Sequence, residues 1–483
     1  MSDIFASLML LGALGSGDGY LPYWATTNQW GLMPERDGAL AIAEAYSPYK
    51  SLGPLEYRWG ASFAANAYDN PLSDRTCNIL VDQLYAGIRW KALSLDIGQK
   101  HRDLEFMAAD PSLGSLSVTG GHVAESGNAL AMPGYLVTLD PVPVPWTGKH
   151  LWLYGAYGDY ATTDNRYVQG ALVHRTRVFL RGDIDRLSIH AGLDHYGMWS
   201  GTSPEYGRQP STLMDYIRVV TGSHAGSTGT ISDQVNVIGD QGGGELIRLD
   251  WRGEGFKVTL QHDIPYNDGS GMGFQNFPDG VNTLWFGFDD KDRWVSDIVL
   301  EHQYTIYQSG PINHEDIGEN GEILTPKNEK TTGGDSYFSN GQYMSCWTHH
   351  GRLIADPLCL PMGVHDGTWS SAVMNLGIEN NRLRALHLGV SGKLWHRHPY
   401  RLMLTRSLNY GTYQSPYTGE SQWDKPWGTV KESGLWQFSA GLTGSVVLPV
   451  RGLSVLYGLF YDHGELLENQ AGLSIGLKYQ IGK

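Results

Sequence analysis

Charged residues are scarce in this chain: only 18% of its 483 residues are Asp, Glu, Lys or Arg, against about a quarter in an average soluble domain. A soluble protein of this size normally covers its surface with charge, so the scarcity argues against a compact soluble enzyme. Gly (62 residues), Tyr (27) and Trp (16) are plentiful instead. This mixture suits a sheet with one face in lipid and the other in water, because Tyr and Trp favour the bilayer interface.

Positive charge and long apolar runs are also lacking. The net charge of -15 argues against nucleic acid as a partner, because no cluster of Lys and Arg is present to neutralise a phosphate backbone. No apolar stretch reaches the roughly 20 residues of a transmembrane helix, so any membrane crossing must be made by strands.

The apolar run Ile4–Gly15 (IFASLMLLGALG) is too short to span a membrane as a helix. It resembles the core of a secretory signal, although no Lys or Arg precedes it. We therefore predict that residues 1–19 are a signal-like or disordered segment outside the fold. Residues 20–483 then form one domain, since no linker or low-complexity tract interrupts them.

Cysteine is rare as well, and three residues exclude a disulfide framework. Cys346 and Cys359 lie close enough in one long segment to form a bridge in an oxidising exterior, but Cys77 would then be left over. Free thiols are the default expectation.

The dominant pattern that is present is apolar–polar alternation with a period of two. It recurs along the chain in runs of roughly 9–11 residues, the length that crosses a tilted barrel wall. The polar face carries Gly, Ser, Thr, Gln, Asp and His, which suit a hydrated lumen, whereas a soluble sandwich, the alternative, would carry Lys and Glu there. In the last run we predict that five residues face lipid: Leu473, Ile475, Leu477, Tyr479 and Ile481.

Connections of unequal length separate these runs. Tight turns are expected at Glu379–Arg382 and Leu448–Arg451, and long segments at Gly197–Gly244, Asp263–Asn282 and Gln308–Thr368. Outer-membrane barrels show this asymmetry, with short periplasmic turns and long outer loops. We therefore predict an all-β fold, a transmembrane antiparallel up-and-down β-barrel in a bacterial outer membrane, with its function in the long loops.

Several of these segments resemble the Wzi-like capsule assembly family, in its Bacteroidetes-type branch. The opening segment Leu21–Met33 (LPYWATTNQWGLM) and Ser126–Tyr135 (SGNALAMPGY) match its motifs, and three loops do so in the family's order: His195–Arg218, Asp268–Gly280 and Gly334–Pro357. The resemblance implies a monomeric barrel of about eighteen strands, within the known range. It also implies a lectin-like role in holding capsular polysaccharide, with outer-membrane lipid around the wall. About twenty residues precede the opening motif, too few for the periplasmic helical bundle of the enteric relatives.

The three loops carry side chains of the kinds that bind sugars. Sugar rings stack on Trp and Tyr, while Asn, Asp, Gln and Arg hydrogen-bond their hydroxyls. Successive outer loops open on one side, so we expect the three to converge over one mouth of the barrel, close it, and present Trp199, Trp347 and Arg352 to the exterior. Packing within a plug or an interfacial belt is the alternative role for each residue. The predicted glycan-binding residues are Trp199, Asp215, Arg218, Asn276, Tyr337, Asn340, Trp347 and Arg352.

Catalytic patterns are missing. The sequence has no nucleophile elbow, phosphate loop, dinucleotide fingerprint or H-E-x-x-H pair, so no catalytic residue and no cofactor is predicted. The pairs His349–His350 and His396–His398 lack a nameable third ligand, so no metal is predicted. Asp289 and Asp290 would point to opposite faces of a strand, which argues against a glycosidase pair. A diffusion channel and a glycan hydrolase stay open as alternatives to binding.

Overall fold

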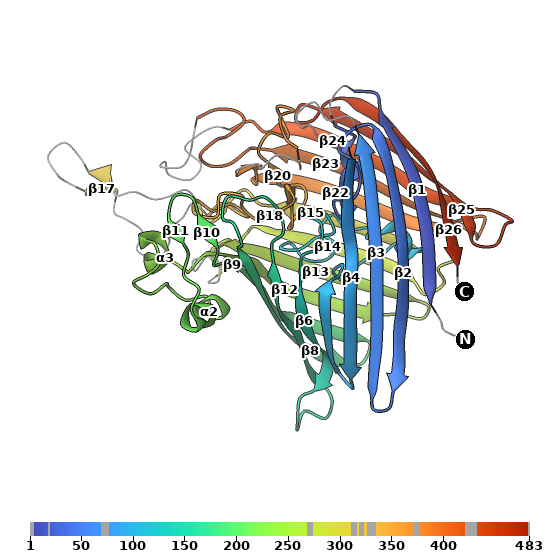
Figure 1. Cartoon of the computed structure of the whole chain (residues 1–483), viewed down its shortest axis with the longest axis horizontal. Helices are drawn as coiled ribbons and strands as arrows, with labels where there is room; N and C mark the ends of the chain where they lie inside the picture. Colours follow the sequence, from blue (N-terminus) through green and yellow to red (C-terminus); the bar gives the residue numbers. More distant parts are fainter. Residues whose placement is uncertain are drawn as a thin grey trace.

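The computed structural model describes residues 4–17, 20–68, 77–267, 274–310, 316–317, 323–325, 335–370, 377–420 and 432–481. Its core is a closed, 18-stranded antiparallel sheet (Figure 1). The sheet has no free edge within these residues, because β1 (Phe5–Gly15) pairs with both β2 (Gly38–Leu52) and β26 (Gln470–Ile481). Closure satisfies the backbone hydrogen bonds of every wall strand, as a membrane interior requires.

The wall follows the chain in an up-and-down order. The strands between β2 and β26 are β3 (Leu55–Tyr68), β4 (Cys77–Trp90), β5 (Leu93–Gln99), β6 (Pro133–Pro143), β7 (Leu151–Ala161), β8 (Leu172–Ile184), β9 (Leu187–Trp199), β12 (Asp240–Arg252), β13 (Phe256–Asn267), β14 (Gly280–Phe288), β15 (Asp297–Tyr304), β22 (Leu383–Leu394), β23 (His398–Asn409), β24 (Leu435–Val447) and β25 (Leu453–Gly464).

Short elements lie in the connections. The helices of the described residues are α1 (Tyr23–Thr26), α2 (Leu213–Val220), α3 (Ile231–Val235) and the 3-10 turn η1 (Pro111–Leu113); none is long and apolar enough to cross a membrane. The remaining strands form two-stranded pairs: β10 (Thr202–Ser203) with β11 (Gly207–Arg208), β16 (Asp316–Ile317) with β17 (Ile323–Thr325), β18 (Thr348–His349) with β19 (Arg352–Leu353), and β20 (Leu360–Pro361) with β21 (Ile378–Asn380).

The last strand confirms the alternation read from the sequence. In β26 the five residues predicted to face lipid are 47–62% exposed, whereas Ser474 between them is 5% exposed. The pleat sends successive side chains to opposite faces, so the apolar set lies outside the barrel and the polar set inside. An apolar outer face is expected for a barrel wall that faces lipid.

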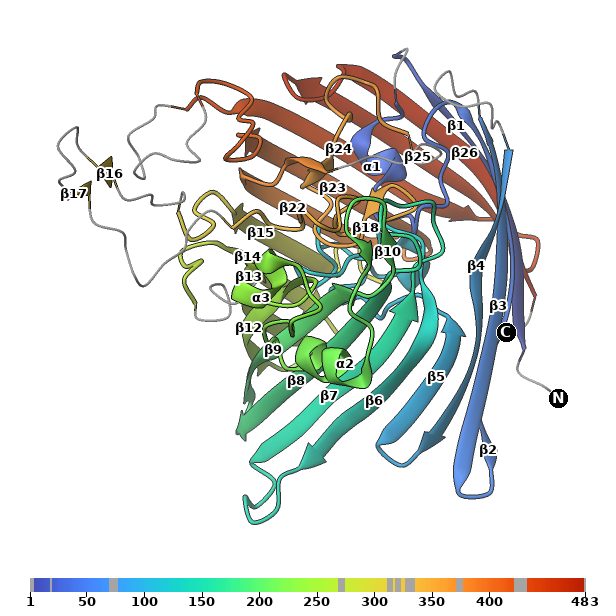
Figure 2. The same ribbon diagram turned by 60° about the vertical axis from the view of Figure 1, so that its left-hand side comes forward.

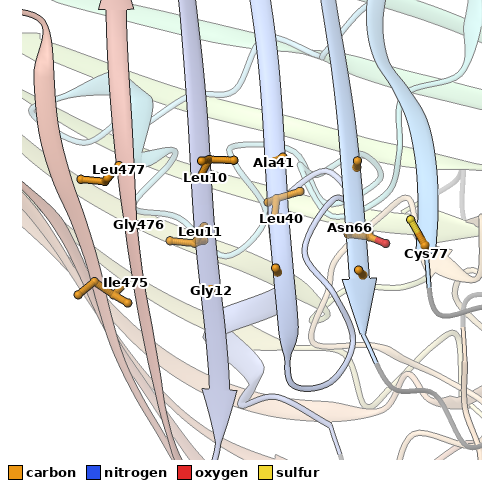
Figure 3. A pocket seen from close by; sticks show the side chains of 13 residues that line it. Leu10, Leu11, Gly12, Leu40, Ala41, Asn66, Cys77, Ile475, Gly476 and Leu477 are labelled. Carbon is orange, nitrogen blue, oxygen red and sulfur yellow. The ribbon is translucent and has the colours of Figure 1, made fainter.

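The outer surface of the wall is shallowly hollowed across β26, β1, β2, β3 and the start of β4 (Figure 3). The hollow measures about 450 Å³ and is lined chiefly by apolar side chains. Exposed Leu10 and Leu477 border it, and Ala39 and Ala67 lie exposed within it. Small residues produce this shape because they leave the wall thinner than its leucine neighbours do. An apolar hollow on the lipid-facing side offers nothing to a polar ligand.

One prediction about the start of the chain is wrong. Phe5–Gly15, assigned above to a segment outside the fold, forms β1, in which Leu10 pairs with Leu477 on one side and Ala41 on the other. The outward residues of β1 are apolar because they meet lipid, and the inward ones pack against the apolar core inside the barrel, where Ala13 is 2% exposed. Both faces are therefore apolar, which imitates the uninterrupted core of a signal sequence.

The connections sort by length onto the two ends of the barrel. One end has short turns such as residues 53–54, 185–186 and 448–452, whereas the other, here called the outer end, has the long segments 100–132 and 200–239, and 305–382 as well. The turn predicted at Leu448–Arg451 is confirmed. The turn predicted at Glu379–Arg382 is wrong: β21 pairs with β20, so these residues end the longest outer connection.

Several aromatic residues lie near the ends of the wall strands, where membrane interfaces favour them. Tyr304 ends β15 and Tyr410 follows β23 at the outer end, while Tyr400 lies near the beginning of β23 at the other. Exposed tryptophans mark the short-turn end: Trp90, Trp146, Trp251, Trp294 and Trp395.

Candidate functional site

The lumen is filled by the connection between β5 and β6, here called the plug (residues 100–132). Every residue from 115 to 132 is buried, although none of these residues belongs to a helix or a named strand. A buried irregular backbone needs hydrogen-bond partners from the surrounding wall. The plug is therefore held by the inward-facing polar side chains of the barrel.

Carboxylates and amides of the wall supply many of those partners. The backbone N–H of Val118 donates to Glu301 Oε2 at 2.6 Å, and that of Val123 donates to Asp263 Oδ2 at 2.7 Å. Gln261 Nε2 donates to the Gly121 carbonyl at 2.6 Å. Glu301 lies on β15 and the other two wall residues on β13, so these two strands hydrogen-bond the plug backbone at several positions.

Strand β8, separated from β13 around the wall only by β9 and β12, contributes an ion pair to the plug. Glu125 of the plug lies 2.5 Å from Arg102 Nε and 2.8 Å from Arg175 Nη2 of β8. Burial raises the pKa of the Glu125 carboxyl, but the charges of Arg175 and Arg102 lower it further, so its pKa ends below the usual value. Arg177 is likewise paired with Asp194 of β9. These lumenal arginines therefore have protein carboxylates as partners.

A second layer, here called the cap (residues 335–370), covers the plug from the outer end. Trp347 Nε1 donates to the Ala124 carbonyl at 3.1 Å, and Ser126 Oγ donates to the Ala355 carbonyl at 2.6 Å. Leu353, Ile354 and Ala355 of the cap are at most 1% exposed. Plug and cap share one apolar core with the inner wall, and a cavity of about 170 Å³ remains between the plug and strands β5–β9.

The cap borders a cavity of about 150 Å³, here called the outer pocket. Its lining comes from the β1–β2 connection, the plug, the cap and the ends of β25 and β26. The rings of Tyr20 and Trp369 meet edge to face with centroids 5.6 Å apart, and the Arg352 guanidinium lies 5.3 Å from the Trp369 ring centroid. The pocket thus joins two aromatic rings, a cation and an apolar wall.

The floor of the outer pocket carries hydrogen-bond acceptors. Asp462 Oδ2 accepts from the Tyr23 backbone N–H at 2.7 Å, and Gln470 Nε2 donates to the Tyr20 carbonyl at 2.6 Å. Among the described residues, the other oxygen of Asp462, Oδ1, and the single side-chain oxygen of Gln470, Oε1, have no donor. Buried acceptors without a donor are costly, so the site favours a molecule that brings hydroxyl groups.

Arg352 is the one predicted glycan-binding residue in this pocket. It lies in β19 and is 8% exposed. Burial lowers the pKa of its guanidinium and the charge of nearby Glu35 raises it in part; an arginine nevertheless stays protonated in proteins.

Three other predicted residues are packed inside the loops. Asn276 is 0% exposed, and its Nδ2 donates to the Pro265 carbonyl at 3.1 Å. The Tyr337 hydroxyl donates to Asp279 Oδ2 at 2.7 Å, and Trp347 contacts the plug as described. Burial raises the pKa of the Asp279 carboxyl to about 6. Their contacts support a structural role.

Trp199 is the last residue of the wall strand β9, and Asp215 and Arg218 lie in α2, in the connection between β9 and β12. Asp215 caps α2 by accepting from the Thr212 backbone at 3.0 Å, and Arg218 Nη1 lies 2.9 Å from Asp215 Oδ1. The Trp199 and Tyr216 rings are 5.3 Å apart. These contacts stabilise α2 against the wall.

Asn340 borders a different cavity, here called the second pocket, of about 630 Å³. Its lining is rich in hydroxyl, amide and carboxyl groups and includes Tyr206, Ser232, Asp233 and Asn236. Asp233 is buried, which raises the pKa of its carboxyl.

The structure confirms that the three loops open at one end, since each connects strands there. It does not present Trp199, Trp347 and Arg352 to the exterior, because all three are 5–8% exposed. The predicted residues are instead divided among the packed loops, the two pockets and the outer side of the wall. The first half of the Asp268–Gly280 motif lies outside the described residues.

Residues of the outer pocket that the sequence analysis missed are Tyr20, Trp369, Asp462 and Gln470. A signal existed for Tyr20, which directly precedes the opening motif Leu21–Met33. The other three stand alone in their segments, so only the closed barrel brings them together.

The histidines considered as metal ligands have other contacts. His349 Nδ1 donates to the Leu130 carbonyl at 2.8 Å, and His396 Nδ1 lies 2.7 Å from the Asp292 carbonyl at the short-turn end. Burial lowers the pKa of His349 to about 3, so it is neutral. No group of three or more potential metal ligands occurs among the described residues. Cys77, Cys346 and Cys359 are free thiols.

No family model and no curated protein sequence matches the chain. Among solved structures, the chain aligns over 100% of its length with 85% of Wzi from Escherichia coli, a carbohydrate-binding β-barrel of the outer membrane involved in group 1 capsule assembly, with a TM-score of 0.55 and 11% identity. It also aligns over 100% of its length with 99% of the outer membrane protein OpdK of Pseudomonas aeruginosa, with a TM-score of 0.47 and 11% identity.

The closed sheet and the likeness to the Wzi barrel therefore show the fold of an outer-membrane β-barrel. The apolar exterior of the wall places this chain in such a membrane.

Proposed function

We propose that this barrel is a Wzi-like capsule assembly protein that holds surface polysaccharide at its outer end, by binding and without turnover. Two independent observations support the family: the loop motifs of the sequence, and the fold shared with the Wzi barrel. The glycan itself is left open by both.

The composition of the outer pocket carries this proposal. A sugar presents an apolar ring face and a rim of hydroxyl groups. Tyr20 and Trp369 offer aromatic surface, while Asp462 Oδ1 and Gln470 Oε1 are acceptors that lack donors among the described residues. Arg352 adds a buried cation beside them, which suits a carboxylate or hydroxyl of the polymer. A volume of about 150 Å³ suits a single sugar unit of a chain.

Packing of the lumen favours binding over diffusion. A channel of this wall would need a water-filled path past the plug, whose residues 115 to 132 are all buried. The plug is held by Glu301 of β15, Asp263 of β13 and Arg175 of β8. Opening a path would break these contacts together.

Binding without turnover also fits the position of the one carboxylate pair considered for hydrolysis. Asp289 and Asp290 lie exposed in the connection between β14 and β15, at the short-turn end. They are therefore at the opposite end of the barrel from the outer pocket.

The central test removes an aromatic ring from the pocket. We expect Trp369→Ala to weaken binding of purified capsular polysaccharide about tenfold or more, because a buried aromatic anchor contributes about 2 kcal/mol. Binding is measured with the folded barrel in detergent micelles. Trp146→Ala is the matched control, because Trp146 is fully exposed in the turn at the other end. Equal binding by the folded Trp369 variant and wild type would contradict the proposal.

The channel alternative has its own measurement. Wild-type protein in a planar bilayer is expected to pass no steady current. A stable open conductance in wild type would favour a diffusion channel. It would contradict the proposal that binding is the only function.

A further inference from the structure

The connection between β9 and β12, here called the flap (residues 200–239), folds over the rim of the barrel. Its helix α2 lies against the outer face of β8 and β9 (Figure 2). A small apolar core separate from the lumen joins it to the wall, formed by Trp199, Val219 and Ile238. A Cβ on Gly197 of β9 would lie 2.7 Å from Val219 Cγ1, so glycine at this position allows the helix to sit close to the strand.

The part of the wall that α2 covers is polar, whereas the wall nearer the short-turn end is apolar. His174 of β8 shares the outward face with Val178 and Leu180, which are 47% and 45% exposed. His174 Nδ1 lies 2.9 Å from Asp159 Oδ1 of β7, and the Tyr216 hydroxyl of α2 donates to Asp159 Oδ2 at 2.7 Å. An ionisable pair facing lipid is costly. The helix shields this pair and completes its hydrogen bonds.

The other side of α2 is apolar and uncovered. Leu213, Met214 and Ile217 are 76%, 55% and 45% exposed. They form one stripe of the helix, because residues at i and i+4 share a face. Helix α3 repeats the arrangement with Ile231 and Val235, which are 81% and 74% exposed.

Such a surface is unfavourable in water and favourable in lipid. It also continues the lipid-facing wall: Val178 and Leu180 of β8 and Leu193 of β9, all exposed, lie on the strands that α2 crosses. A short helix with one apolar face lies in the plane of a membrane interface, with that face among the acyl chains. We infer that α2 and α3 rest in the outer leaflet of the membrane and anchor the flap to the lipid surface.

The anchor has a consequence for the loops above it. The flap also lines the second pocket through Ser232 and Asp233 of α3. Lipid contact therefore fixes one wall of that pocket near the membrane surface. The inference itself depends only on α2, α3 and the wall, so it stands whether or not the barrel binds glycan.

The test measures the depth of α2 in a bilayer. Ile217→Cys carries a nitroxide spin label in a Cys77→Ser background, because the other two cysteines are buried. The full-length barrel is reconstituted in dioleoylphosphatidylcholine vesicles, and collision rates with oxygen and with a water-soluble nickel chelate are compared. Leu193→Cys provides the lipid-facing reference, and Arg208→Cys, at an exposed position of the same flap, provides the aqueous reference.

We expect the Ile217 label to show the high ratio of oxygen to nickel collisions found at Leu193. Met214→Cys offers a second label position on the same stripe, in case a label at Ile217 displaces the helix. A ratio at both positions equal to that at Arg208 overturns the inference. Spectral broadening between labels on different barrels at high dilution in lipid also overturns it, because a second copy then covers the stripe.

Discussion

Leu477 and Lys478 are neighbours in β26, yet they meet different surroundings. Leu477 is half exposed on the outside of the wall, whereas Lys478 reaches into the lumen, where its ammonium lies 3.9 Å from Glu44 Oε1. The pleat alone assigns the two faces. A one-residue error of register would therefore place the lysine in lipid and the leucine in the lumen.

Placing Arg at Leu477 tests this assignment. We expect Leu477→Arg to lower the free energy of unfolding by about 2–4 kcal/mol, the cost of arginine near the bilayer midplane. The measurement is equilibrium unfolding in lipid vesicles. Tyr479→Arg is the control, because Tyr479 lies on the same face nearer the end of β26, where the expected cost is about 0–1 kcal/mol. Equal effects of the two substitutions would refute the proposed depth.

Trp347 shows how a predicted binding residue becomes a packing residue. Its ring meets Tyr196 with centroids 5.7 Å apart, between the cap and the inner wall. We expect Trp347→Ala to destabilise the cap by about 3–5 kcal/mol, the usual cost of deleting a buried large aromatic ring. Limited proteolysis of the cap measures this local effect. Unchanged protection of the cap would show that Trp347 contributes little to its packing.

At the scale of elements, ion pairs hold the plug in place, whereas the wall is stabilised by apolar surface that faces lipid. Glu105 pairs with Arg248 of β12 and with His122, whose Nε2 lies 3.4 Å from Glu105 Oε1. Burial raises the pKa of Glu105, but the hydrogen bond from His122 and the charge of Arg248 lower it further, to below its usual value. Glu125 behaves in the same way beside Arg175.

These two carboxylates predict that acid loosens the plug. A carboxylate with a depressed pKa in the folded state contributes stability above its unfolded pKa of about 4.3, and loses it as the pH falls through the folded value. We therefore expect the protection factors of amide hydrogen exchange in residues 115–132, which correct for the intrinsic effect of pH on exchange, to fall below about pH 4. Burial raises the pKa of Asp356 in the cap to about 6, so acid favours the folded form of that carboxyl and does not add to the effect.

Glu125→Gln is the matched variant for this prediction. It keeps the shape of the side chain but leaves the Arg102 and Arg175 charges without their carboxylate, so the plug of this variant should exchange faster at neutral pH and change less with acid. Protection factors in the wild-type plug that do not change with pH would show that these ion pairs do not hold it.

At the scale of the whole molecule, the sorting of long and short connections assigns the two ends to the two sides of the membrane. Arg208 in the flap and Arg451 in the β24–β25 turn are both exposed and lie at opposite ends. In a Cys77→Ser background we expect a membrane-impermeant maleimide to label Arg208→Cys on intact cells. Arg451→Cys should react only after the outer membrane is permeabilised. The reverse pattern would invert the barrel and move the outer pocket to the periplasmic side.

The sequence by itself determined the wall. The evidence for it lies in local patterns: the alternation from Leu473 to Ile481, the absence of long apolar runs, and the unequal connections. A barrel strand can be recognised from the residues on its own two faces. The same locality explains the failure at β1. Its inward residues, such as Ala13, meet an apolar core that only the closed barrel creates, so period-two alternation disappears from that strand.

Only the tertiary structure shows where the predicted site residues lie and which residues line the outer pocket. The motif residues Asn276, Tyr337 and Trp347 are of types that bind sugars, but their burial depends on the plug beneath the cap, which no local pattern reveals. Asp462 and Tyr20 lie at opposite ends of the chain and meet only because β1 pairs with β26. Alternation fixes the face on which a side chain stands, whereas its neighbours across the lumen depend on closure of the whole sheet and on the loops folded within it.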